Sequence, residues 1–342
     1  MLTEPDPPMT LQHRKLSTLN MPWPPDWDAV FGTAGQNRPL IVEIGFGYGH
    51  MLFHLADSFP DANIIGVELG HKPLEAVEKR IVSRGYHNIR VLYGYAETFL
   101  AHMLRPASVE QIHVNFPDPW FKSGHSHRRL IKRPTVDAIA SRLVPGGMFY
   151  LATDIDAYAE MSHEVLANTP SLTNQFETAW SATIDNRVTT KYEGKALEAG
   201  RTNKYFAYQR NDHPAPDVPL LTEPDMPNLV FKTSLTTSEI ATQFEPHKQS
   251  FPDEDIHVSV MSVFTGSHGL LFEVFVKEPT IEQHTGFLLV EKQDKPGEFT
   301  LRLGSFGHPR ATDGIHRAAV VIENVVKQMA PDYEIVHRKI RE

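Results

Sequence analysis

An apolar run that breaks into three alternating glycines, Leu40 to Gly49, constrains this chain more than any other stretch. Its β-branched residues favour a buried strand, and the residues after Gly49 favour a helix that begins directly behind the loop. Glycine adopts backbone angles that other residues avoid, and it lets a ligand approach the main chain closely. The stretch therefore predicts a strand, a loop and a helix start that can bind a cofactor, although a tight turn without a ligand fits the glycines equally well.

Two carboxylates favour the ligand-binding interpretation. Glu43 lies within an otherwise apolar strand, where a buried carboxylate needs a cation or hydrogen-bond donors. Glu68 ends the next apolar run, nineteen residues after Gly49, where an acid can accept both hydroxyls of a ribose. The alternative for Glu68 is a helix cap or a solvated side chain.

Apolar runs alternate with amphipathic segments through the first half of the chain. Five strands are expected at Leu40 to Gly45, Asn63 to Leu69, Ile89 to Tyr93, Ile112 to Phe116 and Met148 to Thr153. This alternation predicts an α/β fold with a doubly wound, mostly parallel, Rossmann-like sheet covered on both faces. In such a sheet, ligands bind beyond the carboxyl ends of the strands.

The chain of 342 residues is long for one domain, and its prolines mark the expected divisions. A Pro-rich N-terminal arm without periodicity, expected to be partly disordered, covers 1–37, and the main domain covers 38–210. A Pro-rich linker over 211–227 leads to a C-terminal α+β domain over 228–342. Short strands, tight turns and one long helix predict an antiparallel sheet covered by a helix there.

Composition limits the chemistry and the compartment. The chain has no cysteine, and its eighteen histidines show no metal-binding spacing, so we expect no metal. No apolar stretch reaches the length that spans a bilayer, and the first thirty residues lack a leader-like segment, so we expect a cytoplasmic protein without a membrane partner. Of the formal net charge of −9, about −8 lies in residues 211–342.

The most unusual segment reads N-F-P-D-P-W-F-K, from Asn115 to Lys122. Two prolines stiffen the chain on either side of Asp118 and hold its carboxylate in one direction. The aromatic residues around it offer flat surfaces on which a base can stack. The alternative is a rigid loop whose aspartate caps a helix.

A basic run without any acid follows this segment, with cations at Lys122, Arg128, Arg129, Lys132 and Arg133. Such a run is commonly a solvated face, but beside a base-stacking loop it favours a phosphate-binding surface for nucleic acid. Arg128 and Arg129 are the candidate substrate contacts from this run.

With these motifs the sequence resembles the bacterial tRNA (guanine-N7)-methyltransferases, class I enzymes that use S-adenosylmethionine. The resemblance covers about residues 38–210 and rests on six motifs: V-E-I-G-F-G-Y-G at 42–49, G-V-E at 66–68, N-F-P-D-P-W-F-K at 115–122, H-R-R-L-I-K at 127–132, A-T-D at 152–154 and T-K-Y-E-G-K-A at 190–196; the fourth matches the family's H-x-R-R-L-I-K apart from its first spacing. It implies that the main domain is a methyltransferase domain that methylates N7 of a variable-loop guanine in tRNA.

The resemblance also implies cofactor-binding positions. Glu43 with the loop of Gly45 and Gly47 would hold the methionine end of S-adenosylmethionine, and Glu68 would hold its ribose. The family usually has Asp or Asn facing the adenine at position 95. Tyr95 departs from that pattern, so adenine recognition is expected to depend on backbone groups near Ala96.

Positions for catalysis and substrate binding follow from the same motifs. Asp118 matches the proposed catalytic acid and is also counted among the cofactor-binding positions. The expected substrate contacts are Lys122, Asp154, Thr190, Lys191, Tyr192 and Glu193, together with Arg128 and Arg129.

Two alternative functions stay open, as does the role of the C-terminal domain. A nucleotide-dependent oxidoreductase on the same sheet predicts G-x-G-x-x-G, whereas Gly45, Gly47 and Gly49 give G-x-G-x-G. A non-catalytic RNA-binding protein on a methyltransferase scaffold is the alternative from a different class. For the C-terminal domain, an interaction or self-association module is favoured over an RNA-positioning domain or a structural appendage.

Overall fold

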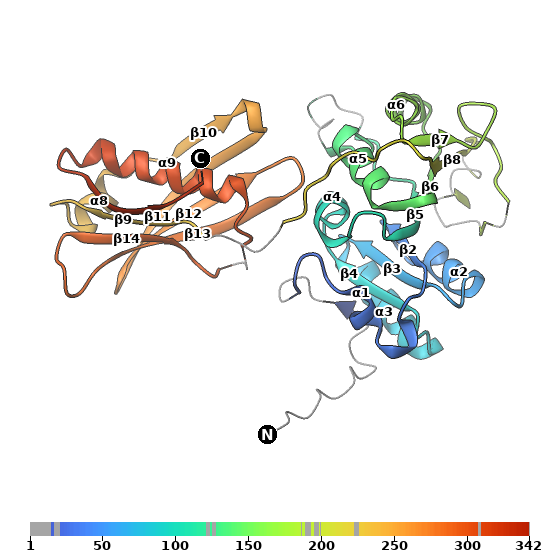
Figure 1. Ribbon diagram of the computed structural model, residues 1–342, viewed down its shortest axis with the longest axis horizontal. Helices are drawn as coiled ribbons and strands as arrows, with labels where there is room; N and C mark the ends of the chain where they lie inside the picture. The colour runs from blue at the N-terminus through green and yellow to red at the C-terminus, as the bar shows by residue number, and fades with distance from the viewer. Residues whose placement is uncertain are drawn as a thin grey trace, which may run out of the picture. The chain divides into compact units, whose positions relative to one another are not determined.

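The computed structural model describes residues 15–16, 21–120, 124, 128–185, 187–188, 193–194, 198, 200–221, 226–306 and 309–341. The chain separates into two compact units, residues 1–220 and residues 221–342 (Figure 1). The division between them falls within the predicted linker. No helix among the described residues combines the length and apolar character needed to cross a lipid bilayer.

The first unit contains an eight-stranded sheet in the order β1-β4-β3-β2-β5-β6-β8-β7. Neighbouring strands are parallel from β1 to β6, and β8 is antiparallel to both of its neighbours. The predicted doubly wound, mostly parallel sheet is thus confirmed. Its strands are β1 (Lys15–Leu16), β2 (Leu40–Ile44), β3 (Asn63–Glu68), β4 (Ile89–Tyr93), β5 (Val109–Asn115), β6 (Leu143–Thr153), β7 (Leu172–Asn174) and β8 (Lys204–Arg210).

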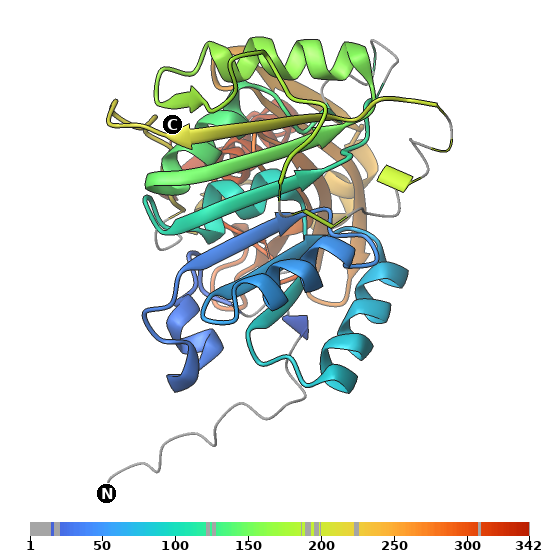
Figure 2. The same ribbon diagram turned by 90° about the vertical axis from the view of Figure 1, so that its right-hand side faces the viewer.

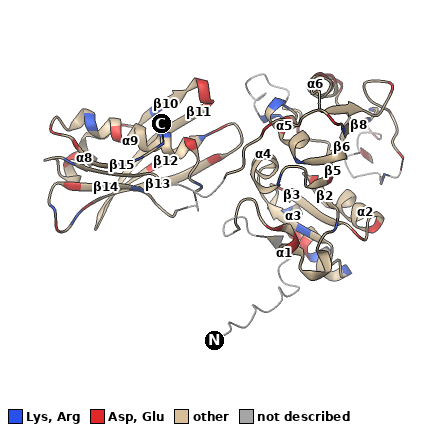
Figure 3. Cartoon of the chain, in the orientation of Figure 1, with Lys and Arg blue, Asp and Glu red and all other residues tan. Residues whose placement is uncertain are grey.

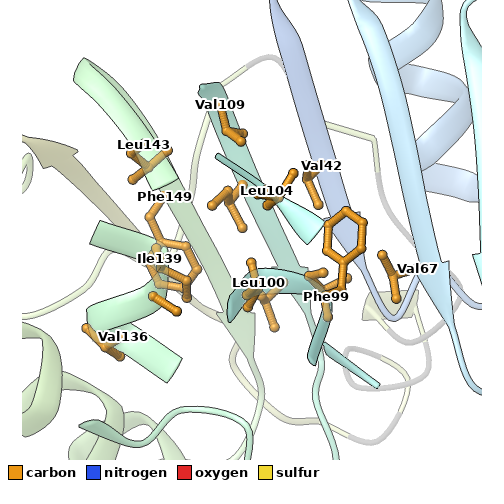
Figure 4. Packing of buried hydrophobic residues seen from close by; sticks show 14 of the residues in the cluster. Val42, Val67, Phe99, Leu100, Leu104, Val109, Val136, Ile139, Leu143 and Phe149 are labelled. Carbon is orange, nitrogen blue, oxygen red and sulfur yellow. The ribbon is translucent and has the colours of Figure 1, made fainter. Parts of the chain in front are cut away.

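Helices cover both faces of this sheet (Figures 1 and 2). Successive strand residues alternate between two apolar clusters: Ile41 packs with α2 (His50–Ser58) and α3 (His71–Arg84), whereas Val42 packs in the cluster of α5 (Arg133–Arg142) and α6 (Asp156–Ala167). Phe99, which opens the π-helical turn η2 (Phe99–Met103) after α4 (Ala96–Thr98), lies in the second cluster with Val42 (Figure 4).

Strand register gathers polar and aromatic side chains on the face that carries Ile41. Glu43 pairs with His113 and His113 with Tyr150, so the three side chains share one face at one level. One step further toward the carboxyl edge, Asn115 and Tyr205 share that face through Ala152. A polar group therefore occupies the sheet where the order of strands reverses, between β2 and β5.

β7 and β8 are neighbours in the sheet, yet residues 175–203 lie between them in the chain. Within this long connection, Ser181 exchanges backbone hydrogen bonds with Tyr205 at 2.9 and 2.8 Å. The connection carries Glu193 and returns to the sheet at Lys204, so both of its ends are fixed by strand pairing.

The N-terminal region departs from the expected arm without regular structure. It contributes β1, the helix α1 (Trp27–Phe31) and the 3-10 turn η1 (Thr33–Gly35). Trp27 and Phe31 are four residues apart on one face of α1 and are buried in the core, and Trp27 Nε1 donates to Met103 O at 2.8 Å. The sequence did not predict this helix, because it is short and lies among prolines, and its stability comes from tertiary packing.

The second unit is a seven-stranded antiparallel sheet in the order β10-β11-β12-β13-β14-β9-β15. The predicted α+β fold is confirmed, including the capping box of Thr236 and Glu239. Its elements are β9 (Asn228–Lys232), α8 (Thr237–Gln243), β10 (His247–Phe251), η4 (Pro252–Glu254), β11 (Ile256–Gly266), β12 (Gly269–Lys277), β13 (Glu282–Glu291), β14 (Glu298–Leu303), α9 (Asp313–Met329) and β15 (Glu334–Lys339).

Residues of α8 and α9 complete the apolar core of this second sheet. The sequence did not indicate β9, β10 or β15. β10 and β15 are the two edge strands and bury almost no side chain, so they lack the alternation that identifies a half-buried strand.

Gly49 supplies a first test of the glycine loop. Its φ is +77°, and a Cβ there would lie 2.9 Å from Val77 Cγ2, whereas Gly146 has φ +84° with nothing within 4 Å. We expect Gly146→Ala to lose about 1–2 kcal/mol of stability from backbone strain and Gly49→Ala to lose a further 1–3 kcal/mol, roughly, from overpacking. Denaturant unfolding followed by tryptophan fluorescence reports on the first unit alone, because all four tryptophans lie there. Equal losses in the two variants would contradict the packing argument.

Candidate active site at the carboxyl edge of the parallel sheet

Glu43 and Asn115 connect β2 and β5 at the point where the order of strands reverses. Asn115 Nδ2 donates to Glu43 Oε1 at 3.0 Å. Glu43 is only 2% exposed, and its Oε2 has no hydrogen-bond partner among the described residues. Burial raises the pKa of the Glu43 carboxyl from 4.5 to about 7, although the hydrogen bond from Asn115 and the charge of Arg187 oppose the rise. A buried, half-satisfied carboxyl at a switch point is suited to a cationic ligand.

The glycine loop beside Glu43 leaves room for such a ligand. Gly45, Gly47 and Gly49 all have positive φ, at 70°, 53° and 77°. A Cβ built on Gly45 would meet no atom of the described residues within 4 Å, so among them the loop borders open space. The backbone therefore fits the close approach of a cofactor that the sequence predicted for Gly45 and Gly47.

Glu68 holds the glycine loop and the start of α3 together. Its Oε2 accepts from Gly47 N, and its Oε1 accepts from Leu69 N and Gly70 N, all at 2.8 Å. Leu69 N and Gly70 N precede α3, which begins at His71, so these contacts fix the turn between β3 and α3 and do not cap the helix itself. The carboxylate is half-buried at the end of β3, and its role toward a ribose stays a prediction.

Tyr95 and Ala96 follow β4 on the same edge of the sheet. Tyr95 is 52% exposed and precedes α4, whose first residue, Ala96, packs against the core. Nearby on β4, Tyr93 stacks on His71 with ring centroids 4.6 Å apart. The phenol of Tyr95 is thus accessible, and its role in adenine recognition stays a prediction.

The loop that carries Asp118 has a strained backbone. Phe116 and Trp120 have φ values of 51° and 42°, each of which costs on the order of 1–3 kcal/mol for residues with a side chain. The backbone of Phe116 is tied to β6, since its N donates to Ala152 O at 2.8 Å. Asp118 lies between the two strained residues and is exposed. Strain of this kind persists only where surrounding contacts impose it.

Arg129 supplies such contacts. Its Nε donates to Pro119 O at 3.2 Å, its Nη2 to Trp120 O at 3.3 Å and its Nη1 to Met161 Sδ at 3.4 Å. Arg128, by contrast, is exposed, and its guanidinium lies 5.0 Å from the centroid of the Trp120 ring. The two neighbouring arginines therefore differ: Arg129 is directed at the loop, and Arg128 is accessible to a phosphate.

The remaining predicted substrate contacts lie on β6 and on the connection before β8. Asp154 directly follows β6 and forms an ion pair with Arg201 at 2.9 Å. Glu193 is buried and forms an ion pair with Arg187 at 3.4 Å (charged residues are marked along the ribbon in Figure 3). The predictions for Lys122, Thr190, Lys191 and Tyr192 lie outside the described residues. Within the described ranges, no three His, Asp or Glu side chains converge as metal ligands.

Sequence reasoning missed three residues of this site: Asn115, Arg187 and Tyr205. Asn115 could have been identified from the sequence, because it is a polar residue that ends a buried strand. It was considered only as the first residue of the N-F-P-D-P-W-F-K motif. Arg187 and Tyr205 gave no signal, since they reach Asn115 and Glu193 only after β8 pairs with β6.

Comparison with known proteins covers the first unit. Residues 37–206 match the family model described as "Putative methyltransferase". The chain is 42% identical over 176 residues to the tRNA (guanine-N(7)-)-methyltransferase of Burkholderia cenocepacia (strain HI2424), which covers 52% of this chain and 68% of that protein. The enzyme of the same name from Ralstonia pickettii (strain 12J) is 42% identical over 177 residues, with the same coverage.

Solved structures match less closely. The crystal structure of TrmN from Thermus thermophilus is 18% identical, covers 53% of this chain and 47% of that chain, and has a TM-score of 0.37. Because this score is below 0.5, the fold assignment rests on the strand order itself.

Proposed function

The chain belongs to the family of tRNA (guanine-N7)-methyltransferases, and we propose on that basis that it methylates N7 of a guanine in tRNA with S-adenosylmethionine as the donor. The observation that carries the proposal is the site at the strand reversal: the buried Glu43 carboxyl has one oxygen without a hydrogen-bond partner among the described residues, and it lies beside a glycine loop with open space at Gly45 in the same part of the chain. A non-catalytic RNA-binding protein would need neither feature.

The residues present fit this cofactor. When bound, S-adenosylmethionine supplies a methyl group on a positively charged sulfur, and its methionine end also carries an ammonium group. Glu43 would neutralise positive charge, Gly45 and Gly47 would line the methionine end, and Glu68 would face the ribose. Tyr95 and the backbone of Ala96 would border the adenine.

Guanine N7 has a free lone pair, so the protein needs no base to deprotonate the attacking atom. Its task is to place the purine, which can supply on the order of 7–11 kcal/mol of the barrier. Asp118 would accept from the N1–H and N2–H edge of guanine and favour the positive charge that develops on the ring. Adenine presents a different donor and acceptor pattern on that edge. Asp154 and Glu193 are the other carboxylates proposed at the substrate.

The tRNA backbone would bind along the basic run, with Lys122 and the segment from Thr190 to Glu193 as further contacts.

Arg128→Ala is expected to reduce the slope of log tRNA affinity against log salt concentration by about 1. The reason is that the exposed arginine neutralises one phosphate and so releases a counterion from the tRNA. Arg129→Ala is expected to leave the salt slope unchanged and to lower turnover, because its donors hold the Asp118 loop. Fluorescence anisotropy of labelled tRNA across salt concentrations measures the slopes, and equal changes in both variants would contradict the assignment.

We also propose a cytoplasmic location, where tRNA is available, and an interaction or self-association role for the second unit. The second unit carries most of the net negative charge of the chain, so it is unsuited to nonspecific phosphate binding.

The decisive experiment combines the purified protein, methyl-labelled S-adenosylmethionine and unmodified tRNA. Label is expected in tRNA, and chemical cleavage specific for N7-methylguanine is expected to map it to a single guanine. The same tRNA with that guanine replaced by adenine serves as the control and should take up no label. Binding of tRNA without any methyl transfer would support the RNA-binding alternative instead.

A further inference from the structure

A chain of partly buried polar contacts runs from Glu43 across the sheet edge to Glu193. Asn115 Nδ2 donates to Glu43 Oε1 at 3.0 Å, and Arg187 Nη2 donates to Asn115 Oδ1 at 2.5 Å. Arg187 Nε then reaches Glu193 Oε1 at 3.4 Å. The side chains of Arg187 and Glu193 are only 6% and 4% exposed. One guanidinium thus links a carboxyl assigned to the cofactor with a carboxylate assigned to the substrate.

Arg187 fixes which way Asn115 faces. A carboxamide has a donor end and an acceptor end, and the guanidinium can only donate. Because Arg187 occupies the Oδ1 end, Asn115 presents its Nδ2 group to Glu43. Without Arg187 the amide could turn and place its oxygen against the carboxyl, which would remove the hydrogen bond that the Glu43 side chain accepts from Asn115. The direct electrostatic attraction between Arg187 and Glu43 would be lost as well.

Arg187 also constrains Glu193 on the other side. Tyr205 OH donates to the same Oε1 that Arg187 contacts, and Asn203 Nδ2 donates to Tyr205 OH at 3.3 Å. The guanidinium lies 5.2 Å from the centroid of the Tyr205 ring. Glu193 is therefore held by a cation and a phenol supplied from two places in the chain, and its position depends on where Arg187 lies.

We propose that Arg187 is a positioning residue that couples the two ligands: through Asn115 it orients Glu43 for the cofactor, and through its ion pair it orients Glu193 for the guanine. The inference rests on the proposed function and extends it to a residue that no motif indicated. Arg187 interacts with both buried carboxyl groups, with Glu43 through Asn115 and with Glu193 directly. A ligand that binds one of these carboxyl groups therefore changes how strongly Arg187 interacts with the other. Binding of one ligand should then change the affinity for the second, and by linkage the effect is reciprocal.

Calorimetry with sinefungin, a cationic cofactor analogue that has no methyl group to transfer, tests this coupling. Its affinity would be measured with and without tRNA, so that the ratio gives the coupling factor. In the unsubstituted protein we expect tRNA to tighten sinefungin binding by about 5-fold or more. In Arg187→Ala we expect sinefungin alone to bind about 10-fold more weakly and the coupling factor to fall to about 1.

Three further variants separate positioning from general damage. Asn115→Ala breaks the link on the cofactor side only, and it should also abolish coupling; the double variant with Arg187→Ala should lose no more coupling than either single variant. Arg187→Lys keeps the charge without the forked donor geometry and should recover part of the sinefungin affinity and coupling. Arg38→Ala removes a half-buried arginine that contacts Pro60 O, at the other end of β2, and should match the unsubstituted protein.

The outcomes separate this inference from the proposed function. An unchanged coupling factor in Arg187→Ala, or a factor of 1 in the unsubstituted protein, would overturn the inference. Failure to methylate tRNA would overturn the proposed function alone, because sinefungin reports binding and not transfer. Tryptophan fluorescence checks that each variant is folded, and if Arg187→Ala is not, a lowered coupling factor in folded Arg187→Lys supports the inference and an unchanged one overturns it.

Discussion

Asp118→Ala is expected to lower the rate of methyl transfer at saturating substrates by at least about 100-fold, the scale seen when one preorganised polar group is removed from an active site. The prolines at 117 and 119 and the contacts of Arg129 hold this loop, so the carboxylate is positioned before guanine arrives. The loss should appear in kcat, because the interaction strengthens as positive charge develops on the purine.

Cofactor affinity separates this effect from misfolding. Calorimetry with S-adenosylhomocysteine should give a Kd within about threefold of the unsubstituted protein, since a lost positioning group need not disturb the cofactor. Asp61→Ala, an exposed aspartate just before β3 at the opposite edge of the sheet, is the matched control and should retain full turnover. If Asp118→Ala kept the turnover of the unsubstituted protein, Asp118 would have no part in the mechanism, and Asp154 and Glu193 would be the remaining candidates for binding the guanine.

Glu43→Gln is expected to stabilise the ligand-free protein at pH 8 and to leave its stability almost unchanged at pH 4.5. The pKa of Glu43 is raised from 4.5 to about 7, so the folded state favours the protonated carboxyl. Its contribution to stability is complete below pH 4.5 and is lost as the pH rises through 7, by up to about 3 kcal/mol. Glutamine cannot ionise and avoids that loss. Denaturant unfolding at the two pH values, followed by tryptophan fluorescence, measures the difference.

Glu43→Gln should also weaken the binding of S-adenosylmethionine. A cationic ligand prefers the ionised form of Glu43, so the affinity of the unsubstituted protein for S-adenosylmethionine should rise between pH 6 and pH 8. Glu43→Gln should bind about 10- to 100-fold more weakly at pH 8 and lose most of that rise. His113, which shares the face with Glu43, does not titrate in this range, because burial lowers its pKa to about 3. A pH-independent affinity in the unsubstituted protein would contradict this account of Glu43.

Local sequence was sufficient for the parts of the site that lie within single strand-to-loop segments. Glu43, the alternating glycines and Glu68 each follow an apolar run, so their place at the carboxyl edge could be inferred from strand and helix alternation. In the second unit, β12 could be inferred in the same way, because it buries every second residue.

Residues that depend on long-range register could not be inferred in this way. Arg187 meets Asn115 across 72 positions of sequence, and only the pairing of β6 with β8 brings Tyr205 to the same face. The different environments of Arg128 and Arg129 could not be predicted either. The sequence of a basic run is the same whether its side chains bind phosphate groups or carbonyl oxygens of the protein. The buried α1 helix was missed because two aromatic residues among prolines give too short a pattern.

The connection between β7 and β8 has a consequence for how this family can change. Its ends are fixed in adjacent strands, and lengthening a loop between fixed ends costs little, about 0.6 kcal/mol for each doubling of its length. Insertions within residues 175–203, away from Arg187 and from the motif at 190–196, are therefore expected to leave the sheet intact. A lineage can adapt to new RNA targets by changing the length of this connection, provided that Arg187 still reaches Asn115 at the end of β5 and still pairs with Glu193.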